Sequence, residues 1–220
     1  AVAMESVIKL VAISILGYVA LFVVFDGPHD MDLWLQSNHF WLSSMQHSIQ
    51  EGPWRTLLLL FFASSVVMPH MFHMAFTENS NASALNTASW GLPLMLLIMA
   101  IMVPPILWAG IFLNVQTPAE YFALGIGLEL QSPTLTAIAF VGGLAAASGI
   151  IIVTTLAMAA MSLNHLVLPL VELNPKKDMY AWLLWTRRWL IVAIFLASYV
   201  FYRFLSQDKG MVDLGIIAFV

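Results

Sequence analysis

The chain has 220 residues, of which 61% are hydrophobic and 9% are charged, and its mean hydropathy is +0.89. Soluble domains carry about 25% charged residues, so this chain has too few polar side chains to cover a surface facing water. The net charge of −4 argues against nucleic acid as a partner, and the absence of cysteine excludes disulfides and thiolate metal sites. We therefore expect a multi-pass membrane protein whose main partner is the lipid bilayer.

Five apolar segments approach the length of about 20 residues that a helix needs to cross a bilayer, and a sixth is truncated at the end of the sequence. We predict spans at residues 2–25, 56–76, 90–113, 135–163, 189–205 and 211–220. The chain begins and ends in apolar sequence, so we expect an internal piece of a longer protein, with the rest of that protein as a further partner. The predicted fold class is all-α, a multi-pass transmembrane helix bundle.

The first span carries two ionisable residues, Glu5 and Lys9, four positions apart. On a helix they share one face and can form an ion pair. Ionisable groups at membrane depth are costly and usually face a cavity or the bundle interior, which indicates an ion or substrate pathway. The alternative is a pair at the helix end whose charged groups reach the cytoplasmic interface.

The stretch 26–54 is polar and rich in turn residues, and we expect it to be an extracytoplasmic loop. Its middle, residues 33–49, mixes aromatic and polar side chains, which is typical of a short amphipathic helix at the membrane interface. We interpret His29, His39 and His47 as interfacial polar residues.

The second span contains Pro69 near its far end, followed by His70 and His73. Proline removes a helix hydrogen bond and is tolerated in lipid where neighbours or a cavity satisfy the freed carbonyl. Imidazoles beside such a break can bind a solute or relay protons, or they can simply hydrogen-bond the freed carbonyls. No third ligand stands at a spacing typical of a metal site. For bis-histidine haem ligation only His165 is available elsewhere, so neither metal nor haem is expected.

The third span contains Pro104-Pro105, which predicts a second helix break. The segment 114–133 that follows carries Glu120 and Glu129, and we interpret it as a second extracytoplasmic loop.

The fourth span is rich in small residues, which let helix backbones approach closely in lipid. Within it, Ser148 stands beside Gly149. A hydroxyl next to a glycine exposes backbone carbonyls that can coordinate a small cation. The alternative is a notch for helix packing, and the composition does not decide between the two.

Basic residues cluster between the fourth and fifth spans, at Lys176, Lys177, Arg187 and Arg188. The positive-inside rule therefore places the 172–188 loop in the cytoplasm and the acidic loops outside. The sequence contains no phosphate-binding glycine loop, nucleophile elbow or zinc-protease motif, so we assign no catalytic residues.

Three collinear stretches resemble a known family. They are Met68-Pro69-His70-Met71-Phe72-His73-Met74-Ala75-Phe76-Thr77-Glu78-Asn79, residues 3–10, and residues 142–149 with 164–169. The first resembles the sixth core helix of the solute:sodium symporter family. Its Phe-His-x-Ala-x-x-Glu-Asn part is similar to the CbrA-like branch, whose transporter-like membrane domain is fused to a sensor histidine kinase. The other stretches are similar to the fifth and eighth core helices of that branch.

The resemblance implies a LeuT-type inverted-repeat fold, from about core helix five to core helix ten, in a bacterial inner membrane. It implies an ion site for Na⁺ at Glu5, Ser6, Ala146, Ser148 and Gly149. Ala146 matches a backbone-carbonyl ligand position. The sequence departs from the transporters in two places. Ser6 stands at a position that is acidic in some transporters, with Glu5 adjacent. Gly149 and Ile150 stand where the transporters have a pair of hydroxyl residues, with Ser148 one residue earlier.

The resemblance also implies that a small solute, an amino or carboxylic acid, binds at His70, Met71 and His73. Met71 falls at a position where sugar transporters use a polar contact. The expected function is a solute transport or sensing module, the N-terminal membrane part of a sensor histidine kinase. One alternative is a sodium-coupled symporter without a kinase. An alternative of another class is a structural or cofactor-holding subunit of a membrane complex.

Overall fold

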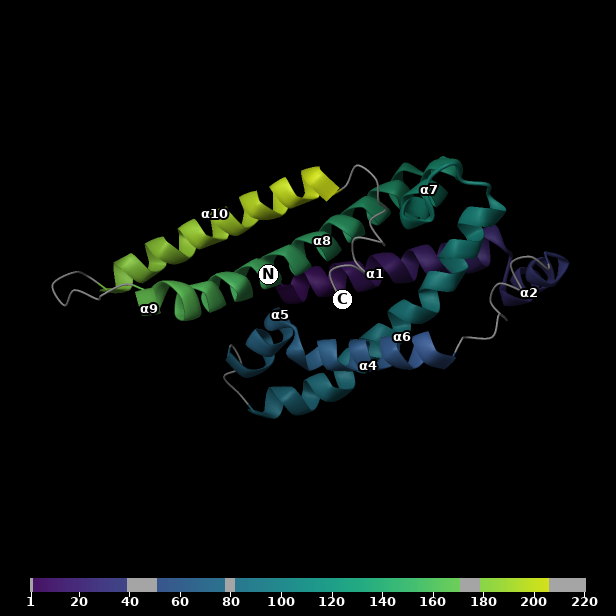
Figure 1. Ribbon diagram of the computed structural model, residues 1–220. Coiled ribbons are helices and arrows are strands. Elements are labelled where there is room, and N and C mark those ends of the chain that lie inside the picture. The colour runs from purple at the N-terminus through teal and green to yellow at the C-terminus, as the bar shows by residue number, and fades with distance from the viewer. Residues whose placement is uncertain (1, 39–50, 78–81, 171–178, 206–220) are drawn as a thin grey trace. The chain divides into compact units, whose positions relative to one another are not determined.

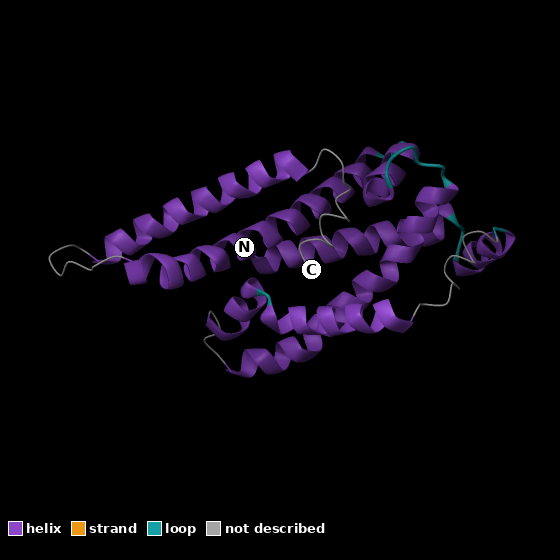
Figure 2. Ribbon diagram, viewed as in Figure 1, coloured by secondary structure: helices purple, strands orange, loops and turns teal. Residues whose placement is uncertain are grey.

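The computed structural model describes residues 2–38, 51–77, 82–170 and 179–205. In these ranges every regular element is a helix, and none is a strand (Figure 2). The chain divides into two compact units. Unit 1 comprises Ala1–Ile49 with Asn81–Ile150, and unit 2 comprises Gln50–Ser80 with Ile151–Val220. The helices of each unit are described within that unit.

Unit 1 combines long helices with short ones (Figure 1). Its elements are α1 (Val2–Val19), the π-helix η1 (Ala20–Val24), α2 (Pro28–Ser37), α6 (Ala82–Phe112), the 3₁₀ turn η3 (Ala119–Tyr121), α7 (Phe122–Glu129) and the first part of α8 (Pro133–Ser162). Its core gathers side chains from α1, α6, α7 and α8, among them Leu16, Ile106, Ile126 and Leu135. These helices bury one face each on a shared apolar cluster, as a helix bundle must.

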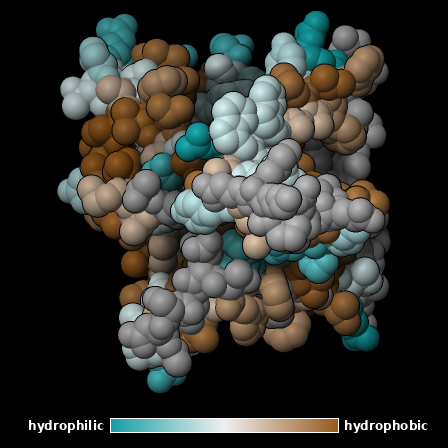
Figure 3. All heavy atoms as spheres, turned by 90° about the vertical axis from the view of Figure 1, so that its left-hand side faces the viewer, coloured by the Kyte–Doolittle hydropathy of each residue, from teal (hydrophilic) through white to brown (hydrophobic). Residues whose placement is uncertain are grey.

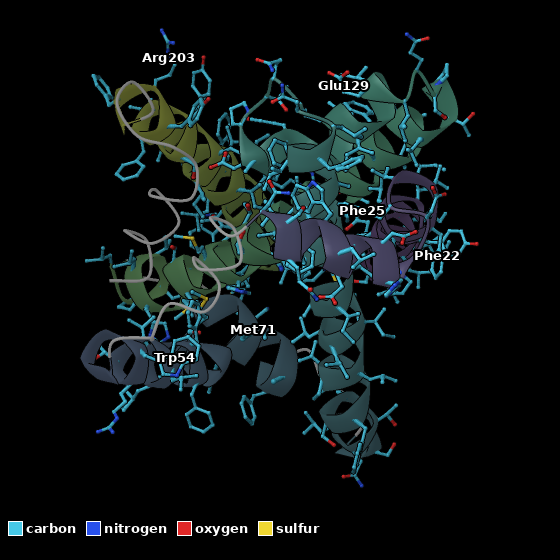
Figure 4. All side chains as sticks on the ribbon, turned by 90° about the vertical axis from the view of Figure 1, so that its right-hand side faces the viewer. Phe22, Phe25, Trp54, Met71, Glu129 and Arg203 are labelled. Atoms are coloured by element: carbon cyan, nitrogen blue, oxygen red, sulfur yellow. The ribbon has the colours of Figure 1, made fainter. Side chains whose placement is uncertain are left out.

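The connection from η1 to α2 is a tight turn. Gly27 has φ 135°, a conformation that side-chain-bearing residues rarely adopt. Pro28 begins α2, at the position where a missing N–H costs nothing. Phe25, labelled in Figure 4, packs its ring against Trp34 and Phe112 at centroid distances of 5.6 and 5.0 Å. This aromatic cluster fixes α2 on the end of the bundle. The predicted interfacial helix therefore begins earlier than expected, and residues 39–49 of that prediction lie outside the described ranges.

The predicted break at Pro104-Pro105 is wrong, because α6 continues through both prolines. Packing accounts for the continuity. A side chain at Gly17 of α1 would place its Cβ 2.6 Å from the sulfur of Met102, so the two helices lie in close contact just before the prolines. Pro105 and Ile106 are buried in this part of α6. Tertiary contacts thus hold a helix that the sequence alone predicts to bend.

The interpretation of 114–133 as a loop is also incomplete, since this segment contains α7. Two buried glycines let α7 pack closely: a Cβ at Gly125 would collide with Val115, and one at Gly127 would lie 2.7 Å from the hydroxyl of Thr136. The helix is too short to cross a membrane, so a search for apolar spans misses it.

Unit 2 contains a helix that is broken at Met68 and two further helical segments, the second part of α8 and α10. Its elements are α4 (Glu51–Val67), α5 (Pro69–Phe72), the π-helix η2 (His73–Thr77), the rest of α8, the π-helix η4 (Leu163–Val167), α9 (Leu168–Leu170) and α10 (Met179–Leu205). α10 packs against η4. Thr155 is buried, and its hydroxyl donates a hydrogen bond of 2.6 Å to the Ile151 carbonyl, so its polar group is satisfied within the helix.

Among the described residues, five helices are long and apolar enough to cross a membrane. They run over Ala3–Val24, Trp54–Phe72, Ser83–Phe112, Pro133–Leu170 and Met179–Phe204. The first five predicted spans are therefore confirmed as long apolar helices, and the predicted span 211–220 lies outside the described residues. Hydrophobic residues cover much of the molecular face in Figure 3. Phe62 and Phe204 are among the exposed large apolar side chains, and each is 79% exposed. Such a surface matches a lipid solvent better than water.

Candidate functional site

The residues predicted to bind ion and solute fall in different units. Glu5, Ser6, Ala146, Ser148 and Gly149 belong to unit 1. His70, Met71 and His73 belong to unit 2. In the first group, Glu5 and Ser6 lie on α1 and the other three residues lie on α8, where Gly149 is close to Glu5. The second group lies on α5 and η2, directly after a helix break.

The ion residues lie where α1 contacts α8. A Cβ at Gly142 would collide with the methyl group of Ala12, and a Cβ at Gly149 would lie 3.0 Å from Oε2 of Glu5. The two glycines are seven residues apart on α8, and their partners are seven residues apart on α1 in the opposite order. This register is that of two antiparallel helices in contact over two turns. These four residues are called the α1–α8 interface below.

The carboxyl group of Glu5 points into this interface. Its Oε2 is enclosed, and it accepts no hydrogen bond from Lys9 or from any other group of the described residues. The predicted pairing with Lys9 therefore leaves this oxygen unsatisfied, although the two residues are one helical turn apart. An enclosed carboxylate oxygen without a partner is unfavourable unless a proton or a cation compensates it.

Ser148 precedes Gly149 on α8, and its hydroxyl donates a hydrogen bond of 3.2 Å to the Ala145 carbonyl in its own helix. This bond uses the only proton of the hydroxyl and leaves the oxygen lone pairs free to accept. Ser148, Ala146 and Ser6 are half-buried. The Ser148 oxygen can therefore offer its lone pairs to a cation, and the hydrogen bond within the helix fixes its orientation.

Two grooves of unit 1 have other linings. A groove of about 420 Å³ runs between α1 and α8, lined by aliphatic side chains such as Val11 and Ile138. A groove of about 660 Å³ lies at the junction of α7 and α8, with Gln131 and Ser132 among its polar residues. Neither lining includes a residue predicted to bind ion, and neither includes an ionisable residue.

The break predicted at Pro69 is confirmed. Met68 has ψ 130°, which ends α4, and Pro69 begins α5. The N–H of Phe72 donates to the Met68 carbonyl at 3.0 Å, so the chain returns to helix at once. Because proline has no N–H, the carbonyl of Ser65 receives no helical hydrogen bond from position 69. We call Met68 to His73 the Pro69 break.

The predicted solute residues follow this break. His70 and Met71 lie on α5, and His73 begins the π-helix η2; all three are half-buried (Met71 is labelled in Figure 4). A groove of about 500 Å³ follows α4 to the break and includes Ser64 and Pro69 in its lining. The two histidines and Met71 are not part of that lining, so they are next to the groove in sequence without forming its wall.

Three π-helical segments were not predicted. They are η1, η2 and η4, and η2 and η4 carry histidines, His73 and His165. Single π turns inside helices are frequent at functional sites, because the extra residue frees backbone groups and redirects side chains. No residue pattern in one sequence marks them, so sequence reasoning had no signal to find them. Over the described ranges, no three His, Asp or Glu side chains lie close enough together to hold a metal ion.

Compared with known proteins, the chain matches no family model, no curated protein and no solved structure. The class that the fold defines is an all-helical chain compatible with a membrane protein, with five described helices of spanning length and composition.

Proposed function

We propose that the chain is a solute transport or sensing module of the solute:sodium symporter type, with a LeuT-type inverted repeat, in a bacterial inner membrane, and that it binds Na⁺ at the α1–α8 interface. One observation supports a bound cation: Oε2 of Glu5 is enclosed between two helices of membrane-spanning length and has no hydrogen-bond partner among the described residues. The ligands would be the Glu5 carboxylate and the oxygen of Ser148.

The physical case depends on the cost of an isolated charge. Removing a carboxylate from water costs several kcal/mol, and an ion pair or a bound cation offsets that cost. Lys9, the nearest cation in the α1 sequence, does not donate to Oε2. Oxygen ligands from a carboxylate and a hydroxyl suit a small hard cation such as Na⁺.

The solute would bind at the Pro69 break, where His70 and His73 supply donors and a helix discontinuity frees a backbone carbonyl. Discontinuous helices in transporters bind substrates for this reason. In a transporter, the helix bundles would move against each other to alternate access. In a sensor, solute occupancy would bias a cytoplasmic kinase toward one state.

The test of the ion site is binding of ²²Na⁺ to the purified full-length protein. We expect Glu5→Gln to weaken binding by about tenfold or more, equivalent to about 1.4 kcal/mol, because the amide cannot offset the positive charge. Glu129→Gln is the matched control: Glu129 is an exposed carboxyl of the same unit, at the end of α7 (Figure 4), and its loss should change nothing.

Equal Na⁺ affinity in the Glu5→Gln variant and the wild type would exclude Glu5 as a ligand. Absence of any Na⁺ binding by the wild-type protein would exclude the proposed ion site altogether. Transport and sensing are then separated by solute uptake into proteoliposomes, with choline replacing Na⁺, and by autophosphorylation of the full-length protein.

A further inference from the structure

Three glycines of α8 lie close together in sequence but have different surroundings. A Cβ at Gly142 would collide with Ala12 of the neighbouring helix. A Cβ at Gly143 would have no neighbour within 4 Å. A Cβ at Gly149 would meet one residue, Glu5, with Oε2 at 3.0 Å and its Cβ at 3.9 Å. The space at Gly149 is therefore bounded by the carboxyl group of Glu5 and not by backbone or by a packed apolar side chain.

This difference separates two roles that small residues have in membrane helices. Gly142 allows the backbones of two helices to approach, which is the usual role. At Gly149, an ordinary side chain would compete with a carboxyl group for the same volume. The residue type at position 149 thus determines where the Glu5 carboxyl group can lie.

We propose that Gly149 is a positioning residue: its missing side chain provides the volume that holds the Glu5 carboxyl group between α1 and α8. The sequence predicted Gly149 as a cation ligand through its exposed carbonyl, whereas this role is steric. The functional consequence depends on the proposed ion site, because a displaced carboxyl group would no longer lie at the α1–α8 interface. The steric claim itself does not need a bound ion.

The size of the substitution sets the size of the effect. Alanine at position 149 would place its methyl 3.0 Å from Oε2, so the carboxyl group must move by a few tenths of an ångström. Valine fills more of the volume and would displace the group entirely, as over-packing does in any close contact. Aspartate at position 5 is one methylene shorter than glutamate and withdraws the carboxyl group, so Glu5→Asp should relieve the contact made by alanine.

The experiment measures the reactivity of the Glu5 carboxyl group in the full-length protein, in liposomes without Na⁺. Dicyclohexylcarbodiimide reaches carboxyl groups from the apolar phase, and a water-soluble carbodiimide reaches them from the aqueous side. Modification of the carboxyl group at position 5 is quantified by peptide mass spectrometry. The variants are Gly149→Ala, Gly149→Val, Glu5→Asp, and Gly149→Ala combined with Glu5→Asp, with Gly143→Val as the control in open space.

We expect modification by at least one reagent to be severalfold faster in Gly149→Val, and faster to a smaller extent in Gly149→Ala. The double variant should react at a rate near that of Glu5→Asp alone, and Gly143→Val at the wild-type rate. Unchanged rates in both Gly149 variants would overturn the proposal. The proposal would also be overturned if Gly149→Ala speeds modification and the double variant still reacts faster than Glu5→Asp alone. That result would indicate a general loosening of the helix pair.

Na⁺ binding is measured on the same samples and reports on the other proposal. If the wild-type protein binds no Na⁺ but the modification rates follow the expected order, the ion site is wrong and the positioning role of Gly149 stands. If Na⁺ binds and the rates do not change, the ion site stands and the steric role of Gly149 is wrong.

Discussion

The α1–α8 interface and the Pro69 break place polar groups in apolar surroundings by opposite means. At the interface both helices are continuous, and one glycine, Gly149, leaves the space that the carboxyl group of Glu5 enters. At the break the helical backbone is interrupted at Met68, and Pro69 has no N–H to donate to the carbonyl of Ser65. The first arrangement depends on packing between two helices, whereas the second depends on the covalent geometry of one proline. Mutations should therefore affect the two regions differently.

The largest effect is expected from Gly142→Val. Even a methyl group at this position collides with Ala12, so valine must separate α1 from α8. Over-packing of this kind costs about 1–3 kcal/mol. Thermal unfolding of the purified protein should show a clearly lower midpoint, and Gly143→Val, whose side chain enters open space, should not. A midpoint for Gly142→Val equal to that of Gly143→Val would show that the interface is not closely packed.

A somewhat smaller change, of opposite sign, is expected from Pro69→Ala. The alanine restores a helical N–H, and a proline in a helix interior costs about 3 kcal/mol, part of which the native break has already relieved. Hydrogen exchange at residues 69–73 should slow as α4 and α5 join. Pro93→Ala is the control, because α6 is already continuous at Pro93. Equal slowing of hydrogen exchange around residues 69 and 93 would contradict the prediction, because no break is present at Pro93.

The smallest effect is expected from Ser148→Ala. It removes one hydrogen bond to the Ala145 carbonyl, which contributes about 0.5–1.5 kcal/mol at most. Ser89 makes the same kind of bond to Asn86 in an exposed part of α6, so Ser89→Ala is a matched control for stability. If Ser148 is a ligand, only its variant should weaken ²²Na⁺ binding. Identical Na⁺ affinity in both variants would remove Ser148 from the ion site.

The sequence predicted the long helices well, because a run of apolar residues near the length of a bilayer is a strong signal for one element. It also predicted the break at Pro69. The same rule failed at Pro104-Pro105, where contacts with α1 keep α6 helical. The rule for apolar spans missed α7, whose packing depends on Gly125 and Gly127 and not on length. Local sequence patterns thus predicted the long helices and the Pro69 break, whereas the continuity of α6 and the presence of α7 depend on tertiary contacts.

The candidate site was predicted in part. Glu5 and Gly149 were identified separately, one as an ionisable residue in a span and the other as part of a small-residue stretch. Their contact depends on the register of two helices that are more than a hundred residues apart, and nothing in the local pattern encodes that register. The pairing predicted for Glu5 used the nearest cation along the helix, Lys9, which does not satisfy its enclosed oxygen.

The register of the α1–α8 interface also limits how the two helices can rearrange. Sliding α1 by one turn, about 5.4 Å, toward the start of α8 would move Glu5 from Gly149 to the methyl groups of Ala145 and Ala146. Either methyl group would crowd the carboxyl group, as alanine at position 149 would. Axial translation is therefore opposed, whereas tilting or rotation about the contact keeps Glu5 opposite its glycine. Any working motion of this helix pair should be a change of crossing angle, with the glycine at the pivot.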